Sequence, residues 1–148
     1  MDAAGINAAI ESLVAGLQAA GVLDEQFSQL LLLQDDSNPE FVVEVVQLYF
    51  DDSVGKIERM GQLLCAPAPN FAELDQIVHQ FKGSSASLGA SHVCALCIRL
   101  REACQAGAGP AAAALVAEIR ASFASLRGQL EQYVALEAAK KALPGGGH

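Results

Sequence analysis

The chain has 148 residues, 52% of them hydrophobic, which is enough to form the core of a single domain. Its formal net charge of −8 and its lack of a basic patch argue against direct binding to nucleic acid, because that binding needs cations at the phosphates. The N-terminal residues include neither a basic region nor a long apolar run, so we expect no signal peptide, no membrane span and an intracellular protein.

Two helices are predicted at the N-terminal end of the chain. The first has apolar residues at helical spacing, namely Ile6, Ile10, Leu13 and Leu17. It is expected to end near Gly21, and a short second helix follows from about Asp24. The run Leu30–Leu33 makes this short helix apolar on more than one side.

Clear start and stop signals bound the next two predicted helices. Asn38-Pro39-Glu40 predicts the start of the third helix, which runs to about Leu64, because a capping residue is followed by proline. Asn70 is the predicted cap of a fourth helix over residues 71–88. Gly89 is placed to end that helix in the left-handed conformation.

Two more helices complete the predicted fold. Ser91 is expected to cap the fifth, which ends near Gly107. The sixth is long and has a continuous apolar stripe of Leu115, Ile119, Phe123, Leu126, Leu130 and Tyr133. Residues 143–148 are expected to form a disordered tail, which leaves residues 1–142 as one helical domain.

Four long amphipathic helices with short connections predict an all-α fold, an antiparallel up-down four-helix bundle. The two additional N-terminal helices would pack over one end or one side of this bundle. The predicted fourth helix would then present its polar face on the outside.

That polar face carries the most informative residues of the chain, His79, Lys82 and Gly83. Their spacings of i, i+3 and i+4 place them on one face of a helix. Apolar residues occupy the other face: Leu74, Ile77, Val78, Phe81 and Leu88. An exposed imidazole beside an ammonium group and a glycine suits a phosphoryl acceptor that a bulky partner must approach. The alternative is an ordinary solvated histidine and lysine, and the spacing by itself favours that alternative.

The run His79–Ala90, HQFKGSSASLGA, resembles the signature of histidine-containing phosphotransfer (HPt) proteins, particularly the plant type that serves cytokinin signalling. The resemblance extends to Asp51-Asp52-Ser53 before it and to Arg101–Cys104 after it, and covers roughly residues 23–133. Some members of this family have lost the histidine and carry no phosphate, whereas this chain retains it.

The resemblance implies a phosphocarrier in a His-Asp phosphorelay. His79 would take a phosphoryl group from the receiver domain of a hybrid sensor histidine kinase and pass it to the receiver domain of a response regulator. Lys82 would support the phosphohistidine and, as a nearby cation, help to keep His79 neutral near pH 7. The resemblance also implies a monomer in the cytoplasm and nucleus.

No phosphate-binding glycine loop, Walker lysine or acidic Mg²⁺ cluster is present in the sequence, which argues against ATP binding and kinase activity. We therefore expect no cofactor and no metal on this chain, with Mg²⁺ held by the receiver domain of the partner. Two alternatives stay open. The chain could be a non-catalytic helical adaptor that binds receiver domains, or an enzyme that uses His79 as an acid–base group.

Residues around His79 have more than one interpretation. Gln80 is expected to meet the partner and Ser84 to hydrogen-bond a phosphoryl oxygen or a bound water, whereas Ser85 and Ser87 are interpreted as small residues for close helix packing. Part of Leu30–Leu33, with Gln80, is expected to form an apolar patch beside His79 that meets a receiver domain. Burial of all four leucines is the alternative.

The sequence leaves the roles of Asp75 and Arg101 open. Asp75, one turn before His79, could oppose the effect of Lys82 or pair with it. Arg101 could reach His79 if its helix is an antiparallel neighbour, or could be a solvated charge.

The four cysteines are interpreted as packing residues with free thiols rather than as a zinc or redox site. Cys94 and Cys97 form a C-x-x-C pair, but a second pair for zinc is missing and no strand precedes the helix. Cys97 and Cys104 fall on one apolar stripe of the predicted fifth helix.

Overall fold

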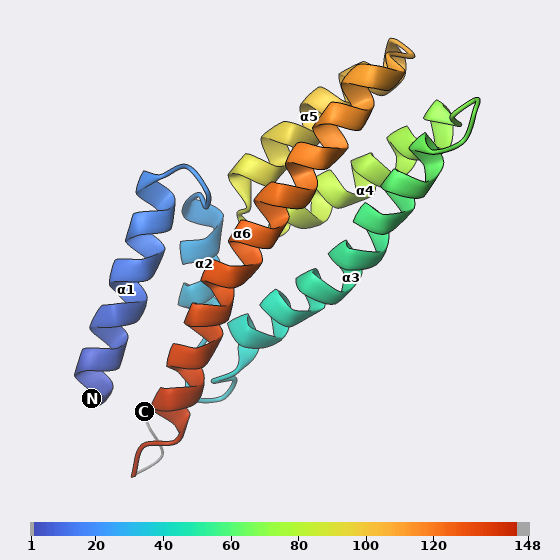
Figure 1. Cartoon of the computed structure of the whole chain (residues 1–148). Helices are drawn as coiled ribbons and strands as arrows, with labels where there is room; N and C mark the ends of the chain where they lie inside the picture. The colour runs from blue at the N-terminus through green and yellow to red at the C-terminus, as the bar shows by residue number, and fades with distance from the viewer. Residues whose placement is uncertain (1, 145–148) are drawn as a thin grey trace.

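A computed structural model describes residues 2–144, and this part of the chain folds into six α-helices without a strand (Figure 1). The helices are α1 (Ala3–Ala19), α2 (Glu25–Leu33), α3 (Phe41–Leu64), α4 (Phe71–Leu88), α5 (Ser91–Gln105) and α6 (Gly109–Lys141). The prediction of an all-α fold is confirmed.

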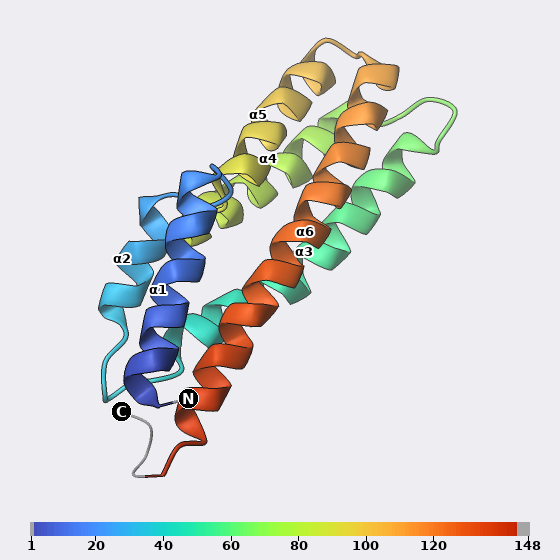
Figure 2. The ribbon, with the colours of Figure 1, turned by 60° about the vertical axis from the view of Figure 1, so that its left-hand side comes forward.

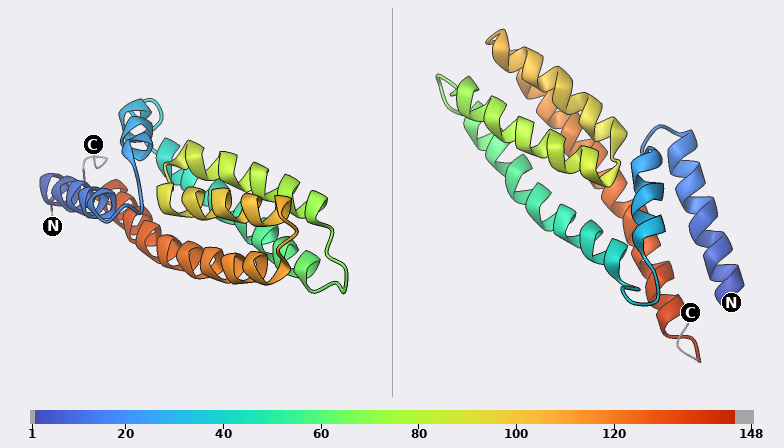
Figure 3. Two further views of the ribbon diagram at one scale, coloured as in Figure 1. Left: turned by 90° about the horizontal axis from the view of Figure 1, so that it is seen from above. Right: turned by 180° about the vertical axis from the view of Figure 1, so that it is seen from behind.

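Helices α3 to α6 form an antiparallel four-helix bundle in which each helix packs against two neighbours (Figure 3, left). Short loops connect them in up-down order, as predicted. Helix α6 extends beyond the bundle, and α1 and α2 lie along its C-terminal half (Figure 2). The two N-terminal helices therefore extend the bundle at one end.

The bundle core is built from the apolar stripes that the sequence shows. All six apolar positions predicted for the last helix are buried, and so are Ile6, Ile10 and Leu17 of α1. Tyr49 stacks against Phe81 across α3 and α4, with ring centroids 6.1 Å apart. Leu48 of α3 is 69% exposed, because it lies on the side of that helix opposite to its buried residues.

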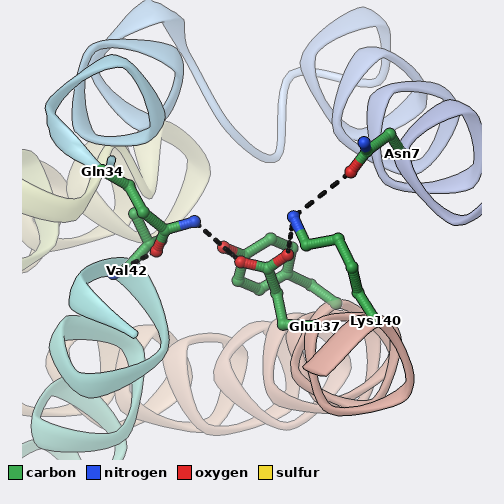
Figure 4. A network of polar contacts seen from close by, with 6 residues as sticks. Asn7, Gln34, Val42, Glu137 and Lys140 are labelled. Atoms are coloured by element: carbon green, nitrogen blue, oxygen red, sulfur yellow. Dashed lines mark hydrogen bonds and ion pairs between the residues drawn. The ribbon is translucent and has the colours of Figure 1, made fainter. Parts of the chain in front are cut away.

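A buried polar network joins the N-terminal helices to the last turns of α6 (Figure 4). The carboxylate of Glu137 accepts hydrogen bonds from Gln34 Nε2 at 2.8 Å and from the Tyr133 hydroxyl at 3.1 Å. Lys140 Nζ lies 3.0 Å from the same carboxylate and donates to Asn7 on α1. Because buried polar groups are costly without partners, this network favours one position of α1 and α2 on α6.

The predicted start of α3 at Asn38-Pro39 is wrong, since the helix begins at Phe41. Asn38 Oδ1 instead accepts a hydrogen bond of 2.7 Å from the backbone N–H of Asp35, which closes the turn before the helix. Gln34, four residues before the expected cap, takes over its role: its Oε1 accepts from the N–H of Val42 in the first turn.

The predicted ends of α4 are confirmed. Asn70 Oδ1 accepts from the N–H of Glu73 at 3.0 Å, and Gly89 ends the helix with φ +90°. Gly89 also allows a close approach, because a Cβ atom there would lie 2.7 Å from the backbone nitrogen of Phe27. The N–H of Asp24 donates to the carbonyl of Gly89, so the start of α2 is attached to the end of α4.

Ser91 does not cap α5, contrary to the prediction. It is the first residue of the helix, after Ala90, and its hydroxyl donates to the carbonyl of Gly21 at 3.0 Å. The serine therefore connects α5 to the loop between α1 and α2.

The predicted disordered tail, residues 143–148, falls mostly outside the described residues. Within them, Leu143 is half-buried against the core, so this first tail residue is part of the folded domain. None of the helices in residues 2–144 combines the length and the apolar character needed to cross a membrane.

Candidate functional site

The rotation of α4 about its axis decides which residues are available to a partner. The side that faces the core consists of Leu74, Val78, Phe81, Ser85 and Leu88. His79, Gln80 and Gly83 are exposed on the other side, and Lys82 is half-buried at its edge. The prediction that His79 faces solvent with Lys82 and Gly83 around it is therefore confirmed by the geometry.

Gly83 leaves the surface next to His79 open. A Cβ atom at this position would meet no described atom within 4 Å beyond the local helix backbone. The glycine is therefore not required for packing inside this chain, although it lowers helix stability by about 1 kcal/mol relative to alanine. An exposed stretch of backbone remains one turn after the histidine.

His79 is engaged from the neighbouring helix by Arg101 of α5. Arg101 Nη1 lies 3.1 Å from His79 Nδ1, while Arg101 Nε donates to Asp75 Oδ1 at 3.0 Å. A second contact, 3.4 Å long, joins Arg101 Nη2 to the other carboxylate oxygen of Asp75. The hydrogen bonds that Asp75 accepts from Arg101 raise the pKa of the guanidinium above its ordinary value.

The contact with Arg101 determines the role of each ring nitrogen of His79. A guanidinium group has donors only, so Nδ1 must accept the hydrogen bond and carries no proton. In the neutral imidazole the proton is then on Nε2, which Arg101 does not engage. His79 is exposed, and Nε2 is the ring nitrogen that has no hydrogen-bond partner among the described residues; it becomes a nucleophile when its proton is on Nδ1 instead.

Two cations flank this imidazole, and one carboxylate is close to them. Asp75 pairs with Arg101 rather than with Lys82, which settles the role that the sequence left open. Among the described residues no carboxylate pairs with Lys82, so its charge is available to an incoming anion. An exposed imidazole beside uncompensated positive charge is suited to a phosphoryl group.

Comparison with known proteins points the same way. The family model described as the Hpt domain matches residues 44–139, which include His79 and Arg101. Histidine-containing phosphotransfer protein 4 of Arabidopsis thaliana is 46% identical over 113 residues, covering 76% of this chain and 89% of that protein. This chain belongs to the histidine-containing phosphotransfer family.

Two further HPt relatives cover nearly the whole chain. Histidine-containing phosphotransfer protein 1 of Oryza sativa subsp. japonica is 39% identical over 137 residues, which are 93% of each protein. The crystal structure of a histidine-containing phosphotransfer protein from maize superposes with a TM-score of 0.86 at 37% identity, covering 90% of this chain and 98% of that one. The family resemblance read from the sequence is thus confirmed, together with the helical bundle.

Of the remaining residues predicted for the HPt site, Gln80 is exposed and available to a partner, but Ser84 is not near the imidazole. Ser84 lies about 140° around the helix from His79. Its hydroxyl donates to the carbonyl of Phe81 within the same helix at 3.1 Å. The expectation that Ser84 contacts a phosphoryl oxygen is therefore not supported by its position.

The two serines interpreted as packing residues differ. Ser85 is buried and its hydroxyl lies 2.8 Å from that of Tyr49, so it packs between α3 and α4 as expected. Ser87 is exposed and donates to the carbonyl of Gly83, so the packing interpretation is wrong for this residue.

The apolar patch expected from Leu30–Leu33 exists, but not beside His79. Leu32 and Leu33 are 76% and 60% exposed, so burial of all four leucines is excluded. However, α2 meets the C-terminal end of α4 through its own first turn and then runs away from it (Figure 3, right). The exposed leucines lie at the far end of α2.

Ile98 of α5 is an exposed apolar residue closer to the imidazole. It is 45% exposed and precedes Arg101 by three residues, which places the two on the same face of the helix. Because Arg101 contacts His79, Ile98 lies about one turn away from the site. No motif or spacing in the sequence marks this residue as part of the site.

Cys97 and Cys104 pack in the core, as predicted, whereas Cys65 is exposed and Cys94 is half-buried; all four thiols are free. Cys97 and Cys104 are buried, and burial raises the pKa of Cys97 to about 12 and that of Cys104 to about 11. Among residues 2–144 no group of three or more potential ligands is arranged to hold a metal ion.

Proposed function

We propose that this HPt protein carries phosphoryl groups between receiver domains and that His79 is the residue modified, at Nε2. The observation that carries the proposal is the exposed imidazole whose Nδ1 is engaged by Arg101, which leaves Nε2 for the partner. The free charge of Lys82 and the open surface at Gly83 support it.

The chemistry needs one nucleophile from this chain. In the tautomer that has the proton on Nδ1, the lone pair of His79 Nε2 attacks the phosphorus of an aspartyl phosphate on the first receiver domain, which requires Arg101 to release Nδ1. The Nε2–P bond forms, the P–O bond breaks with its electron pair returning to the aspartate, and the proton on Nδ1 passes to water. Lys82 offsets the negative charge that arrives with the phosphoryl group.

The second transfer reverses these bonds. Nδ1 takes up a proton, the aspartate of a response regulator attacks phosphorus, and the electron pair of the broken N–P bond stays on Nε2 of a neutral ring. Both transfers use the catalytic aspartate and Mg²⁺ of the receiver domains, so we propose that this chain needs no cofactor, binds no ATP and has no kinase activity of its own. We also propose that it acts as a monomer in the cytoplasm and nucleus, within cytokinin signalling.

The partner must cover the exposed face of α4 to reach His79. We propose that the rim of the receiver domain fits over Gly83, where a side chain is missing, and that Ile98 provides an apolar contact on the α5 side. Gln80 is exposed on the α3 side of the same face and is proposed as a polar contact. The exposed leucines of α2 would be reached only by a larger partner surface.

A two-step transfer assay tests the proposed function. A receiver domain carrying ³²P-labelled aspartyl phosphate is mixed with the protein, the labelled protein is isolated, and a second receiver domain is then added. We expect label to appear on this chain and then to move to the second receiver. Binding of both receivers without any labelling would contradict the phosphocarrier and indicate an adaptor, whereas labelling from ATP alone would indicate kinase activity.

A further inference from the structure

We propose that Arg101, held by Asp75, is a positioning residue that makes His79 selective for a docked receiver domain over small phosphodonors. In the resting protein Arg101 keeps the imidazole in the tautomer that cannot attack phosphorus, and a docked receiver domain releases it. This inference deepens the proposed function and rests on it, since the reaction concerned is phosphorylation of His79 at Nε2.

Asp75 gives the guanidinium of Arg101 a defined orientation toward the imidazole. Arg101 Nε and Nη2 lie 3.0 and 3.4 Å from the two carboxylate oxygens of Asp75, while Nη1 lies 3.1 Å from His79 Nδ1. A planar guanidinium with two contacts to one carboxylate is fixed in direction. Asp75 and His79 are one turn apart on α4, so a single arginine from α5 spans both.

The contact places the ring proton of His79 on the nitrogen that has to react. A guanidinium group only donates, so Nδ1 accepts and the neutral ring carries its proton on Nε2. A protonated Nε2 has no free lone pair with which to attack phosphorus. The reactive form is the other tautomer, with the proton on Nδ1, and the contact with Arg101 lowers its population. The ring is nevertheless exposed, so the contact does not block access to it.

Arg101 is placed where a docked receiver domain would reach it. Its side chain is 28% exposed, and it follows Ile98, the proposed receiver contact, by three residues on the same face of α5. In the described structure Nη1 is the one guanidinium nitrogen that is not hydrogen-bonded to Asp75. An acceptor oxygen on the partner can therefore draw Nη1 from the imidazole while Nε stays with Asp75.

Receiver domains and small phosphodonors differ in how they meet the cost of this release. A receiver domain that docks over α4 and α5 makes contacts far from the phosphorus, and that binding energy can offset the cost of separating Arg101 from Nδ1. A small phosphodonor such as phosphoramidate makes no such contacts. The resting protein should therefore react with docked receivers in preference to small donors.

Lys82 is the reference for a purely electrostatic effect. It is a cation three residues after His79 on the same helix, but no hydrogen bond joins it to the ring in the described structure. A cation that only attracts an anionic donor speeds phosphorylation, so its removal slows the reaction. Arg101 is also a cation, yet its proposed role predicts the opposite sign with a small donor.

The first experiment measures phosphorylation of the full chain by phosphoramidate at pH 8, where histidine side chains are largely neutral. In this reaction the Nε2–P bond forms, and the nitrogen of the donor, protonated in solution, leaves as ammonia with the electron pair of the broken P–N bond. The proton on Nδ1 of His79 passes to water. The label found in His79→Gln is subtracted, so that the rate refers to His79 alone.

Arg101→Met should raise this rate by roughly three- to tenfold, the range of one partly exposed, charge-assisted hydrogen bond. Lys82→Met should lower it. Arg99→Met is the matched control and should leave it unchanged, because Arg99 is also on α5 but pairs only distantly with Glu118, at 3.9 Å.

The second experiment detects the tautomer directly, by NMR of the unphosphorylated protein with ¹⁵N in its histidine rings. The wild type should show His79 with its proton on Nε2, and Arg101→Met should show a larger share of the ring with the proton on Nδ1. Circular dichroism and thermal melting establish that each variant is folded. Asp75→Asn, with little change in size, should shift the tautomer in the same direction because it loosens Arg101, and it provides the test if Arg101→Met does not fold.

The outcomes distinguish this role from the proposed function. A wild type that takes no label from a phosphorylated receiver domain contradicts the proposed function. The role of Arg101 is overturned, and the phosphocarrier left intact, if the resting ring has its proton on Nδ1 or if phosphoramidate labels a folded Arg101→Met variant no faster than the wild type. The ratio of the receiver rate to the phosphoramidate rate should fall by roughly threefold or more in Arg101→Met, and an unchanged ratio would also overturn the selectivity.

Discussion

The hydroxyl groups of Tyr49 on α3 and Ser85 on α4 lie 2.8 Å apart inside the bundle. Burial raises the pKa of Tyr49 above its ordinary value, so its hydroxyl stays protonated and can donate. The pair holds one side of α4 against α3. His79 lies about 120° around the axis from Ser85, and this buried contact therefore helps to keep the imidazole on the outside.

Replacing Gly83 by glutamine should show whether the glycine is needed for access of a partner to His79 or for folding. The new side chain has space within the chain and raises helix propensity, so the free energy of unfolding should stay the same or rise by roughly 0.5–1 kcal/mol. Transfer from a phosphorylated receiver should fall by roughly tenfold to a hundredfold, because the partner is displaced from His79. Rates come from rapid-quench labelling and stability from urea unfolding.

Gly16→Gln is the control for that experiment, because Gly16 is also an uncrowded helical glycine but lies on α1. It should leave transfer unchanged. If Gly83→Gln folds normally and transfers at the wild-type rate, the glycine has no role in access.

Much of this fold follows from the spacing of apolar residues, as the long stripe of α6 and the exposed position of His79 show. Local signals were also sufficient to predict both ends of α4, because the cap at Asn70 and the left-handed turn at Gly89 depend only on residues nearby in the sequence. The start of α3 was misplaced because the side chain of Asn38 can either cap the helix or close the preceding turn, and it does the latter. Gln34, four residues earlier, supplies the acceptor for the helix instead, a choice that depends on the conformation of the whole loop between α2 and α3.

The candidate site was predicted only where its members share a helix. His79, Lys82 and Gly83 are close in sequence, so helical spacing brings them together. Arg101 reaches His79 across two helices, and which acid it pairs with depends on the register between them. Spacing along a single helix carries no information about that register. Ser84 was misplaced for a different reason: it is close to His79 in sequence but points to another side of the helix.

Ile98→Ser tests the proposed receiver contact. Removing this exposed apolar side chain should weaken binding of a receiver domain by roughly 1–2 kcal/mol, because an apolar contact near the centre of the interface is lost. Isothermal titration calorimetry gives the affinity. Val54→Ser is a matched control, because Val54 is 44% exposed and Ile98 is 45% exposed. Val54 is away from the site, since it lies one turn after Asp51, and Asp51 faces α6 rather than α4. Equal losses of receiver affinity in the two variants would show that Ile98 is not part of the interface.

The polar network at the end of α6 should contribute to stability rather than to transfer. Glu137→Ala leaves Gln34, Tyr133 and Lys140 without their shared acceptor, and we expect it to lower the free energy of unfolding by about 1–3 kcal/mol. The exposed Glu131, paired with Arg127 at the surface, is the control and should cost no more than about 0.5 kcal/mol when changed to alanine. A neutral Glu137→Ala in chemical denaturation would show that the network adds no stability.

The thiols should react in the order of their accessibility. Burial raises the pKa of Cys97 and Cys104 to about 12 and about 11, so both remain protonated at pH 8.5, and the thiolate is the form that alkylates. Iodoacetamide should therefore modify the exposed Cys65 well before these two, and all four should react once the chain is unfolded. Mass spectrometry of timed samples provides the measurement; rapid labelling of Cys97 in the folded protein would contradict its buried position.

The most direct test of the account is which histidine takes the phosphoryl group. His79 and His92 are both exposed, but only His79 has an arginine on Nδ1 and a lysine three residues later. After incubation with a phosphorylated receiver domain, the wild type and His92→Gln should carry one labile phosphoryl group per chain, and His79→Gln should carry none. Label that persists in a folded His79→Gln variant, or that disappears in His92→Gln, would contradict the assignment of His79.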